Sequence, residues 1–278
     1  MTANEDQIKF WNDKAGQDWT ELQERMDANL SGIHDAVMAF AAPMSGMAIL
    51  DVGCGTGTTS MALARIAGPN GRVTGLDISR PMLDLARRRA EQARLKITFV
   101  EGDAAVQPFK PDYDLVFSRF GVMFFDNPIT AFANIKKALK PGGRLAFVCW
   151  RTPPENPWAS APLAAARPFL PDQPPPDPLA PGPFAFADSQ RVKDILDKAG
   201  FRDVTIRKYD GVMTMGQDVA SVAAQTLRIG PLSRALADVD ETARAKIVEV
   251  VRAALEKFRG ISGEVAPPTA CWLVGASS

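Results

Sequence analysis

Short apolar runs alternate with helix-like stretches between residues 46 and 150. Each run has the length of a strand and is bounded by turn residues, as expected for a buried parallel strand. The strands predicted in this way lie at 47–52, 72–77, 96–101, 113–118 and 144–150. The predicted helices lie at 58–66, from Ser79 to about residue 94, and at 128–139, the last stopped by Pro141-Gly142-Gly143. This alternation favours crossover units, a parallel sheet and an α/β fold with helices on both faces.

The two flanks have different patterns. Residues 1–45 indicate two helices ending at Pro43. Residues 153–183 hold twelve prolines in thirty-one positions, but aromatic residues among them favour an ordered loop or short-helix insertion over a disordered linker. Further on, the predicted helices lie at 188–199, 218–229 and 240–257, and the predicted strands at 204–209 and 270–274.

We therefore divide the chain into four segments. The division predicts an N-terminal helical cap at 1–45, a core at 46–150, a proline-rich insertion at 151–187, and a C-terminal part at 188–278 that completes the sheet and the cap.

Charge and composition narrow the classes of partner. The chain has 32 basic and 32 acidic residues and no net charge at pH 7. No basic stripe stands out, which argues against nucleic acid as a ligand. The densest basic run, Arg87-Arg88-Arg89, is expected on a solvated helix face.

Targeting and metal signals are also lacking. The N-terminus is polar and acidic, and no apolar run approaches the roughly 18 residues needed to span a bilayer. The single histidine and the scattered Cys54, Cys149 and Cys271 have no metal-ligand spacing. We expect a cytoplasmic protein with no membrane span and no metal.

The segment at 49–57, ILDVGCGTG, runs from a predicted strand through a glycine loop into a helix. Such a loop lets the backbone approach a ligand closely, and the start of the helix offers free N–H groups. Dinucleotide sites need G-x-G-x-x-G, but the sixth positions counted from Gly53 and Gly55 are Thr58 and Ser60. The loop therefore favours another ligand, with a nucleotide-linked oxidoreductase as the alternative.

Two acids follow the next two strands. Asp77 ends its strand twenty residues after Gly57, where a carboxylate can accept hydrogen bonds from both ribose hydroxyls of an adenosine. Asp103 follows the third strand and can accept from an adenine amino group, beside the backbone of Ala104. Each could also be a turn or capping residue. Together with the glycine loop, they indicate an adenosine-containing ligand.

Five segments, ILDVGCGTG, GLDIS, EGDA, DLVFSRFGVMFF and LKPGGRLAFV, resemble successive motifs of the class I S-adenosylmethionine-dependent methyltransferases. The nearest likeness is to the small-molecule branch that includes the ubiquinone and menaquinone biosynthesis methyltransferases. The likeness is close over about 46–150 and holds only in outline in the flanks. It implies S-adenosylmethionine as cofactor and a Rossmann-like, mostly parallel sheet of seven strands, over which the flanks would form a helical, proline-rich cap. The last strand would be antiparallel, with 204–209 and 270–274 as the final pair.

The resemblance also implies which residues contact the cofactor. Those at its methionine end would be Asp51, Gly53, Gly55 and Gly57. Asp77 would bind the ribose. Those around the adenine would be Ile78, Met82, Asp103 and Ala104. Ser118 and Arg119 would lie beside the sulfonium and the amino acid group.

A small, hydrophobic or aromatic acceptor is expected outside the carboxyl ends of the strands. The candidate pocket residues are aromatic: Trp11, Trp19, Phe120, Phe124, Trp150 and Trp158. They could equally be core residues. Arg151 is interpreted as a surface residue or as a partner for an acidic substrate group.

His34, the single histidine, is the candidate general base, or else an exposed residue near a helix start. An amine, thiolate or acidic phenol would need no base. The methylated atom (O, N or C) and the oligomeric state stay open, as does a catalytically inactive cofactor-binding module.

Overall fold

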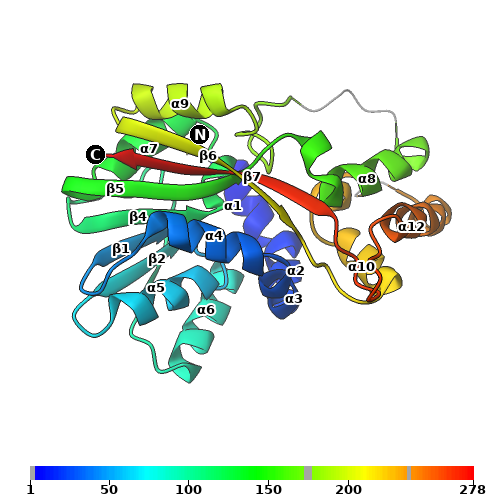
Figure 1. Cartoon of the computed structure of the whole chain (residues 1–278), viewed down its shortest axis with the longest axis horizontal. Helices are drawn as coiled ribbons and strands as arrows, with labels where there is room; N and C mark the ends of the chain where they lie inside the picture. Colours follow the sequence, from blue (N-terminus) through cyan, green and yellow to red (C-terminus); the bar gives the residue numbers. More distant parts are fainter. Residues whose placement is uncertain (1–3, 172–176, 237–238) are drawn as a thin grey trace.

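The computed structural model describes residues 4–171, 177–236 and 239–278 (Figure 1). Within them, seven strands form one sheet in the order β3-β2-β1-β4-β5-β7-β6. Their bounds are β1 Ala48–Val52, β2 Arg72–Asp77, β3 Thr98–Glu101, β4 Tyr113–Arg119, β5 Leu139–Trp150, β6 Arg202–Val212 and β7 Pro268–Ser277. The first five strands are parallel, and β7 runs antiparallel to β5 and β6. The predicted fold class and final strand pair are confirmed.

The apolar runs form the middle of the sheet. Every residue of β1 is buried, because β2 and β4 flank it and helices cover both faces. The core continues toward β5, where Phe147 packs against Phe132 and Phe186 with ring centroids 5.6 Å and 6.4 Å away. Apolar burial of this extent provides a rigid platform at the carboxyl ends of the strands.

Helices cover the two faces of the sheet (Figure 1). On one face lie α4 Ser31–Ala41, α5 Thr58–Ala67 and α6 Arg80–Gln92, and on the other α7 Pro128–Lys136 and α9 Ser189–Lys198. The side chains of Asn127 and Asp188 cap α7 and α9 by accepting from backbone N–H groups. Ser79 precedes α6 as predicted, but its hydroxyl donates to the Trp11 carbonyl instead of capping the helix.

The cap lies beyond the carboxyl ends of the parallel strands (Figure 1). Its helices are α1 Glu5–Asn12, α2 Lys14–Glu21, α3 Gln23–Asn29, α8 Pro157–Ala166, α10 Val219–Thr226, α11 Pro231–Ala235 and α12 Glu241–Glu256. The expectation of two helices in residues 1–45 was wrong: the described part forms four, because the backbone leaves helical geometry at Asp13, Leu22 and Leu30. The short α11 was not predicted. No helix in the described ranges has both the length and the apolarity to cross a membrane.

The predicted boundary between α7 and β5 was wrong. Helix α7 ends at Lys136 and β5 already begins at Leu139, so Pro141-Gly142-Gly143 lies inside the strand. The pairing with β4 is irregular there, since Tyr113 faces Leu139 while Leu115 faces Arg144. Gly142 has a φ of 77°, and the Pro-Gly-Gly turn is absorbed as a bulge.

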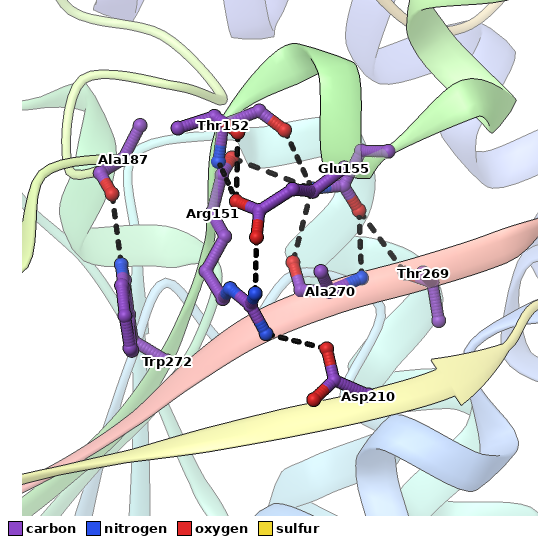
Figure 2. A network of polar contacts seen from close by, with 9 residues as sticks. Arg151, Thr152, Glu155, Ala187, Asp210, Thr269, Ala270 and Trp272 are labelled. Atoms are coloured by element: carbon purple, nitrogen blue, oxygen red, sulfur yellow. Dashed lines mark hydrogen bonds and ion pairs between the residues drawn. The ribbon is translucent and has the colours of Figure 1, made fainter.

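The proline-rich insertion contains the short 3₁₀ helices η2 Pro153–Glu155 and η3 Arg167–Phe169 on either side of α8. A short-helix insertion is therefore confirmed, although residues 172–176 lie outside the described residues. Figure 2 shows how its start is anchored to β6 and β7. Asn156 donates to the Ala270 carbonyl and accepts from its N–H, both at 3.0 Å.

Arg151 forms the centre of this anchor (Figure 2). Its guanidinium pairs with Glu155 and Asp210 and lies 5.2 Å from the ring centroid of Trp272. Both sequence interpretations of Arg151 were wrong, because the residue is only 6% exposed and its partners are within the chain. It ties the insertion to the sheet edge.

Candidate functional site

A cavity lies at the carboxyl ends of the parallel strands, with walls from both the sheet and the cap. The predicted cofactor residues on its wall are Gly53, Gly55, Asp77, Ile78, Met82, Asp103, Ala104 and Arg119. The predicted pocket residues on its wall are Trp11, Trp19, Phe120, Phe124, Trp150 and Trp158. Asp51, Gly57, Ser118 and His34 are not on the wall.

The glycine loop makes close backbone contacts. Gly53 has a φ of 68°, and a Cβ there would lie 2.6 Å from the Cα of Gly121. A side chain at Gly57 would lie 2.9 Å from the Cβ of Ala86, so Gly57 serves the packing of α5 against α6. The glycines therefore act in two ways: Gly53 shapes the wall, and Gly57 brings the two helices together.

Asp77 supports the loop from the end of β2. Its carboxylate accepts from the N–H of Gly55 at 2.7 Å and from that of Ser79 at 2.9 Å. Burial raises the pKa of the Asp77 carboxyl, while these backbone hydrogen bonds oppose the rise. The carboxylate thus has a fixed orientation at the cavity wall.

Asp103 holds the N-terminal segment. The side-chain amide of Asn4 donates to both oxygens of Asp103 at 2.9 Å, and the Ala105 N–H donates to one of them at 2.9 Å. Asn4 is also tied to Asp126 through its backbone N–H and its side-chain oxygen. A carboxylate has about four acceptor positions, so one remains for a ligand.

Two buried polar atoms near the loop have no partner. The hydroxyls of Thr59 and Ser60 each donate to Oδ2 of Asp51 at 2.6 Å, but Asp51 Oδ1 has none. Nη1 of Arg119 is likewise buried without a partner. Burial raises the pKa of the Asp51 carboxyl from 3.8 to about 6. Buried polar groups are nearly always satisfied, so these two atoms are candidates for ligand contacts, Arg119 from the cavity wall and Asp51 from beside it.

Asp27, from α3 of the cap, lies on the cavity wall near Arg119. It accepts from Arg89 at 2.9 Å and from the Thr58 hydroxyl, and it lies 3.6 Å from Arg119. The expectation of a fully solvated basic run was therefore wrong for Arg89, whose side chain is 19% exposed. Burial lowers the pKa of Arg119, although Asp27 and Asp51 favour its charged form.

Aromatic side chains from the strand ends and from the cap line the cavity in two series. Trp11 is in edge contact with Trp19 and Phe124, with ring centroids 6.2 Å and 5.4 Å away. Trp150 stacks on Phe120 at 4.1 Å and contacts Trp158 at 4.8 Å. These residues belong to the cavity wall and are also packed against each other.

Phe120 is a residue of the cavity wall with an unusual backbone conformation. It follows Arg119 and has a φ of 66°, in the left-handed region that bulky residues rarely adopt. The Phe120 N–H donates to the Val148 carbonyl, and the ring stacks on Trp150, so neighbouring groups hold this conformation. Strain of this kind, of about 1–3 kcal/mol, concentrates at functional sites.

Comparison with known proteins supports this picture. A family model described as a methyltransferase domain matches residues 49–143. The demethylmenaquinone methyltransferase of Lactococcus lactis is 37% identical over 107 residues, which cover 38% of this chain and 42% of that protein. The ubiquinone/menaquinone biosynthesis C-methyltransferase of Ruegeria sp. is 40% identical over 121 residues, 41% of this chain and 48% of that protein. The chain thus matches less than half the length of these two relatives.

A longer match decides the family. The demethylmenaquinone methyltransferase of Staphylococcus haemolyticus is 30% identical over 177 residues, which cover 60% of this chain and 73% of that protein. The chain belongs to the class I S-adenosylmethionine-dependent methyltransferases. The resemblance seen in the sequence motifs is therefore confirmed.

Solved structures share the methyltransferase fold at low identity. A Haemonchus contortus phosphoethanolamine N-methyltransferase in complex with phosphomonomethylethanolamine and S-adenosylhomocysteine has a TM-score of 0.53 at 19% identity, covering 89% of this chain and 52% of that one. The [4+2]-cyclase SpnF has a TM-score of 0.54 at 20% identity, covering 88% and 80%. One fold therefore accompanies different chemistries.

The residues fit the cofactor of class I methyltransferases. The orphaned Asp51 Oδ1 can accept from its α-ammonium, and the orphaned Nη1 of Arg119 can donate to its carboxylate. Ser118 has a structural part instead: its hydroxyl is buried, donates to the Val52 carbonyl and accepts from the Gly121 N–H.

His34 lies within α4, and its Nδ1 is buried without a partner. Burial and the nearby Arg119 lower its pKa. The structure does not bring His34 to the cavity wall with the other candidates.

Sequence reasoning missed several residues that shape the candidate site. They are Asn4, Asp27, Arg89, Arg228 and Arg234. All but Arg89 come from the flanks, where no motif of the family signals them. Arg228 pairs with Asp18 and Glu21 of α2, which joins the C-terminal part of the cap to the N-terminal part.

Proposed function

We propose that this protein transfers a methyl group from S-adenosylmethionine to a small, apolar or aromatic acceptor. The observation that carries the proposal is that one cavity joins the glycine loop and the acids of β2 and β3 to an aromatic chamber under the cap. A cofactor and an acceptor could meet there side by side. The relatives that methylate demethylmenaquinone, by their printed names, support an apolar acceptor.

On this proposal the walls divide between the cofactor and the acceptor. Asp77 would accept from the ribose hydroxyls, and the remaining acceptor position of Asp103 would face the adenine beside Ile78, Met82 and Ala104. Asp51 and Arg119 would hold the amino acid end, with Gly53 and Gly55 close to it. The support comes from the two orphaned atoms and from the fixed orientation of Asp77.

The cofactor, when bound, supplies an electrophilic methyl group on its sulfonium. The chain then has to align the acceptor atom with the methyl group and exclude water. Phe120, Trp150 and Trp158 would form the apolar wall that does both. Asp27, Asp77 and Asp103 are each engaged by other groups of the chain, and His34 lies off the wall. We therefore favour an acceptor that needs no base, such as an amine, a thiolate or an acidic phenol.

Isothermal titration with S-adenosylmethionine and separately with NAD tests the cofactor. We expect micromolar binding of S-adenosylmethionine and no binding of NAD, because the glycine loop lacks the dinucleotide spacing. Binding of NAD alone would move the chain to the oxidoreductases. Turnover with a panel of amines, thiols and phenols then separates an enzyme from an inactive cofactor-binding module.

We also propose a reducing, cytoplasmic location. Its support is that Cys54, Cys149 and Cys271 are free and buried.

A further inference from the structure

The cavity wall carries charged side chains, and all but one have a partner in the described part of the chain. Asp27 is bound by Arg89 and lies near Arg119, Asp77 accepts from two backbone N–H groups, and Asp103 accepts from Asn4. On the cap side, Arg228 pairs with Asp18 and Glu21. Arg234 has no hydrogen bond or carboxylate partner among the residues that the structure describes.

Arg234 stands in apolar and aromatic surroundings. It lies in α11, and residues 229–234 all line the cavity. Its guanidinium carbon is 4.2 Å from the ring centroid of Phe10, which in turn is in edge contact with Trp11. Arg234 is exposed to solvent, and its guanidinium stays protonated. Within the described residues, the N–H donors of Arg234 are therefore unpaired, as is Nη1 of Arg119 beside the glycine loop.

Arg234 is exposed, so water solvates its guanidinium, and an anionic group that enters the cavity can take the place of that water. A guanidinium presents a planar fork of N–H donors that matches a carboxylate or phosphate, and the cation–π contact with Phe10 orients the group without using those donors. The acids on the cavity wall are held elsewhere, so none of them supplies the missing anion.

We propose that Arg234 binds an oxyanion group on the acceptor, so that the substrate is an aromatic or apolar molecule with a carboxylate or phosphate. The apolar part lies among Trp11, Trp158 and the other aromatic side chains, and the oxyanion lies against α11. This inference rests on the proposed function, because it takes the aromatic side of the cavity as the acceptor site. It makes Arg234 a specificity-determining residue with no part in activating the methyl group.

Isothermal titration with three naphthalene probes of the same shape tests the proposal. The probes are 2-naphthoate, 2-naphthyl phosphate and the neutral 2-naphthamide, each with and without S-adenosylhomocysteine. We expect at least one anionic probe to bind the wild-type protein about tenfold more tightly than the amide, as for a charged hydrogen-bonded pair. The preferred anion distinguishes a carboxylate from a phosphate acceptor.

Arg234→Gln should bind the anionic probes and the amide about equally tightly, with the affinity for the amide unchanged from wild type. The matched control is Arg252→Gln on α12, whose exposed ion pair with Glu249 lies away from the cavity wall. It should keep the wild-type preference. Urea denaturation of each variant checks that it is folded.

Equal affinity for the anions and the amide in the wild type would overturn the proposal. A preference that survives in Arg234→Gln, or no binding of any probe, would overturn it too. Titration with S-adenosylhomocysteine alone distinguishes failure of this proposal from failure of the proposed function. A protein that binds the anions but not S-adenosylhomocysteine contradicts the proposed function and not the role of Arg234.

Discussion

Replacing Asp51 by asparagine should stabilise the cofactor-free protein and weaken its binding of cofactor. The Asp51 carboxyl is fully buried, and only Oδ2 receives hydrogen bonds, from Thr59 and Ser60. Burial raises its pKa from 3.8 to about 6. Ionising this group in the folded protein is therefore unfavourable until a cation meets Oδ1.

The sign of the pH dependence follows from this shift. Between pH 3.8 and about 6 the folded protein binds the Asp51 proton more tightly than the unfolded chain does. The free energy of unfolding therefore falls as pH rises through this window and is level above it. Ionisation of Asp51 lowers the free energy of unfolding by about 3 kcal/mol in total, of which about 2 kcal/mol is lost between pH 4.5 and 7.5. A neutral asparagine side chain lacks this contribution.

Urea denaturation at pH 4.5 and 7.5 measures the effect. Unfolding followed by circular dichroism and by tryptophan fluorescence should give coincident transitions, which justifies a two-state free energy. The free energy of unfolding changes between pH 4.5 and 7.5, and this change should differ by about 2 kcal/mol between wild type and Asp51→Asn. The surface variant Asp84→Asn serves as the control and should behave as wild type. Equal pH dependence of the free energy of unfolding in wild type and Asp51→Asn would refute the raised pKa of Asp51.

Binding should change in the opposite direction. An asparagine in place of Asp51 cannot offer a charged acceptor to an α-ammonium, so Asp51→Asn should weaken S-adenosylmethionine binding by about 1–3 kcal/mol at pH 7.5. A variant that is more stable and binds equally well would show that Asp51 Oδ1 does not face the ligand.

Three further outcomes can be measured with the same methods. Asp77→Ala should weaken S-adenosylmethionine binding by about 1–3 kcal/mol in calorimetry, and unchanged affinity would overturn the ribose assignment. His34→Ala should keep cofactor affinity and turnover at neutral and alkaline pH, because the residue lies off the cavity wall; a selective loss of turnover would restore it as a base. Arg228→Ala removes a partner of the buried Asp18 and should lower the free energy of unfolding by about 1–3 kcal/mol, against less than about 0.5 kcal/mol for Arg252→Ala. Equal costs for the two would show that the Arg228 contact does not stabilise the cap.

The sheet could be predicted because its signals are local. The apolar run at 72–77 is bounded by turn residues and became β2 with the same bounds. The glycine loop and Asp77 follow strands that pair side by side, so their proximity needs only the parallel crossover rule. The Pro-Gly-Gly at 141–143 misled the prediction, since a stop signal for a helix also suits a bulge at the start of a strand.

The cap could be predicted only in outline. Aromatic residues in the flanks indicated a pocket, and Trp11, Trp19 and Trp158 do line the cavity. The partners of Asp27 and Arg228 could not be found from spacing, because each contact joins segments far apart in the chain. Such pairings depend on tertiary packing, which leaves no local periodicity in the sequence.

The sheet could thus be predicted better than the cap, and the site is divided between the same two parts of the molecule. The cofactor side consists of a continuous strand–loop–helix unit and the two strand ends beside it, so its chemistry can be derived from one continuous stretch of the chain. The proposed acceptor side needs α2 and α11 to come together, and the pairing of Arg228 with Asp18 holds the segment just before α11 against α2. Arg234 lies in α11 itself, so the proposed anion specificity depends on the folded cap. Changes in the flanks can therefore alter the acceptor while the cofactor motifs stay the same, which is why the motifs identify the family but not the substrate.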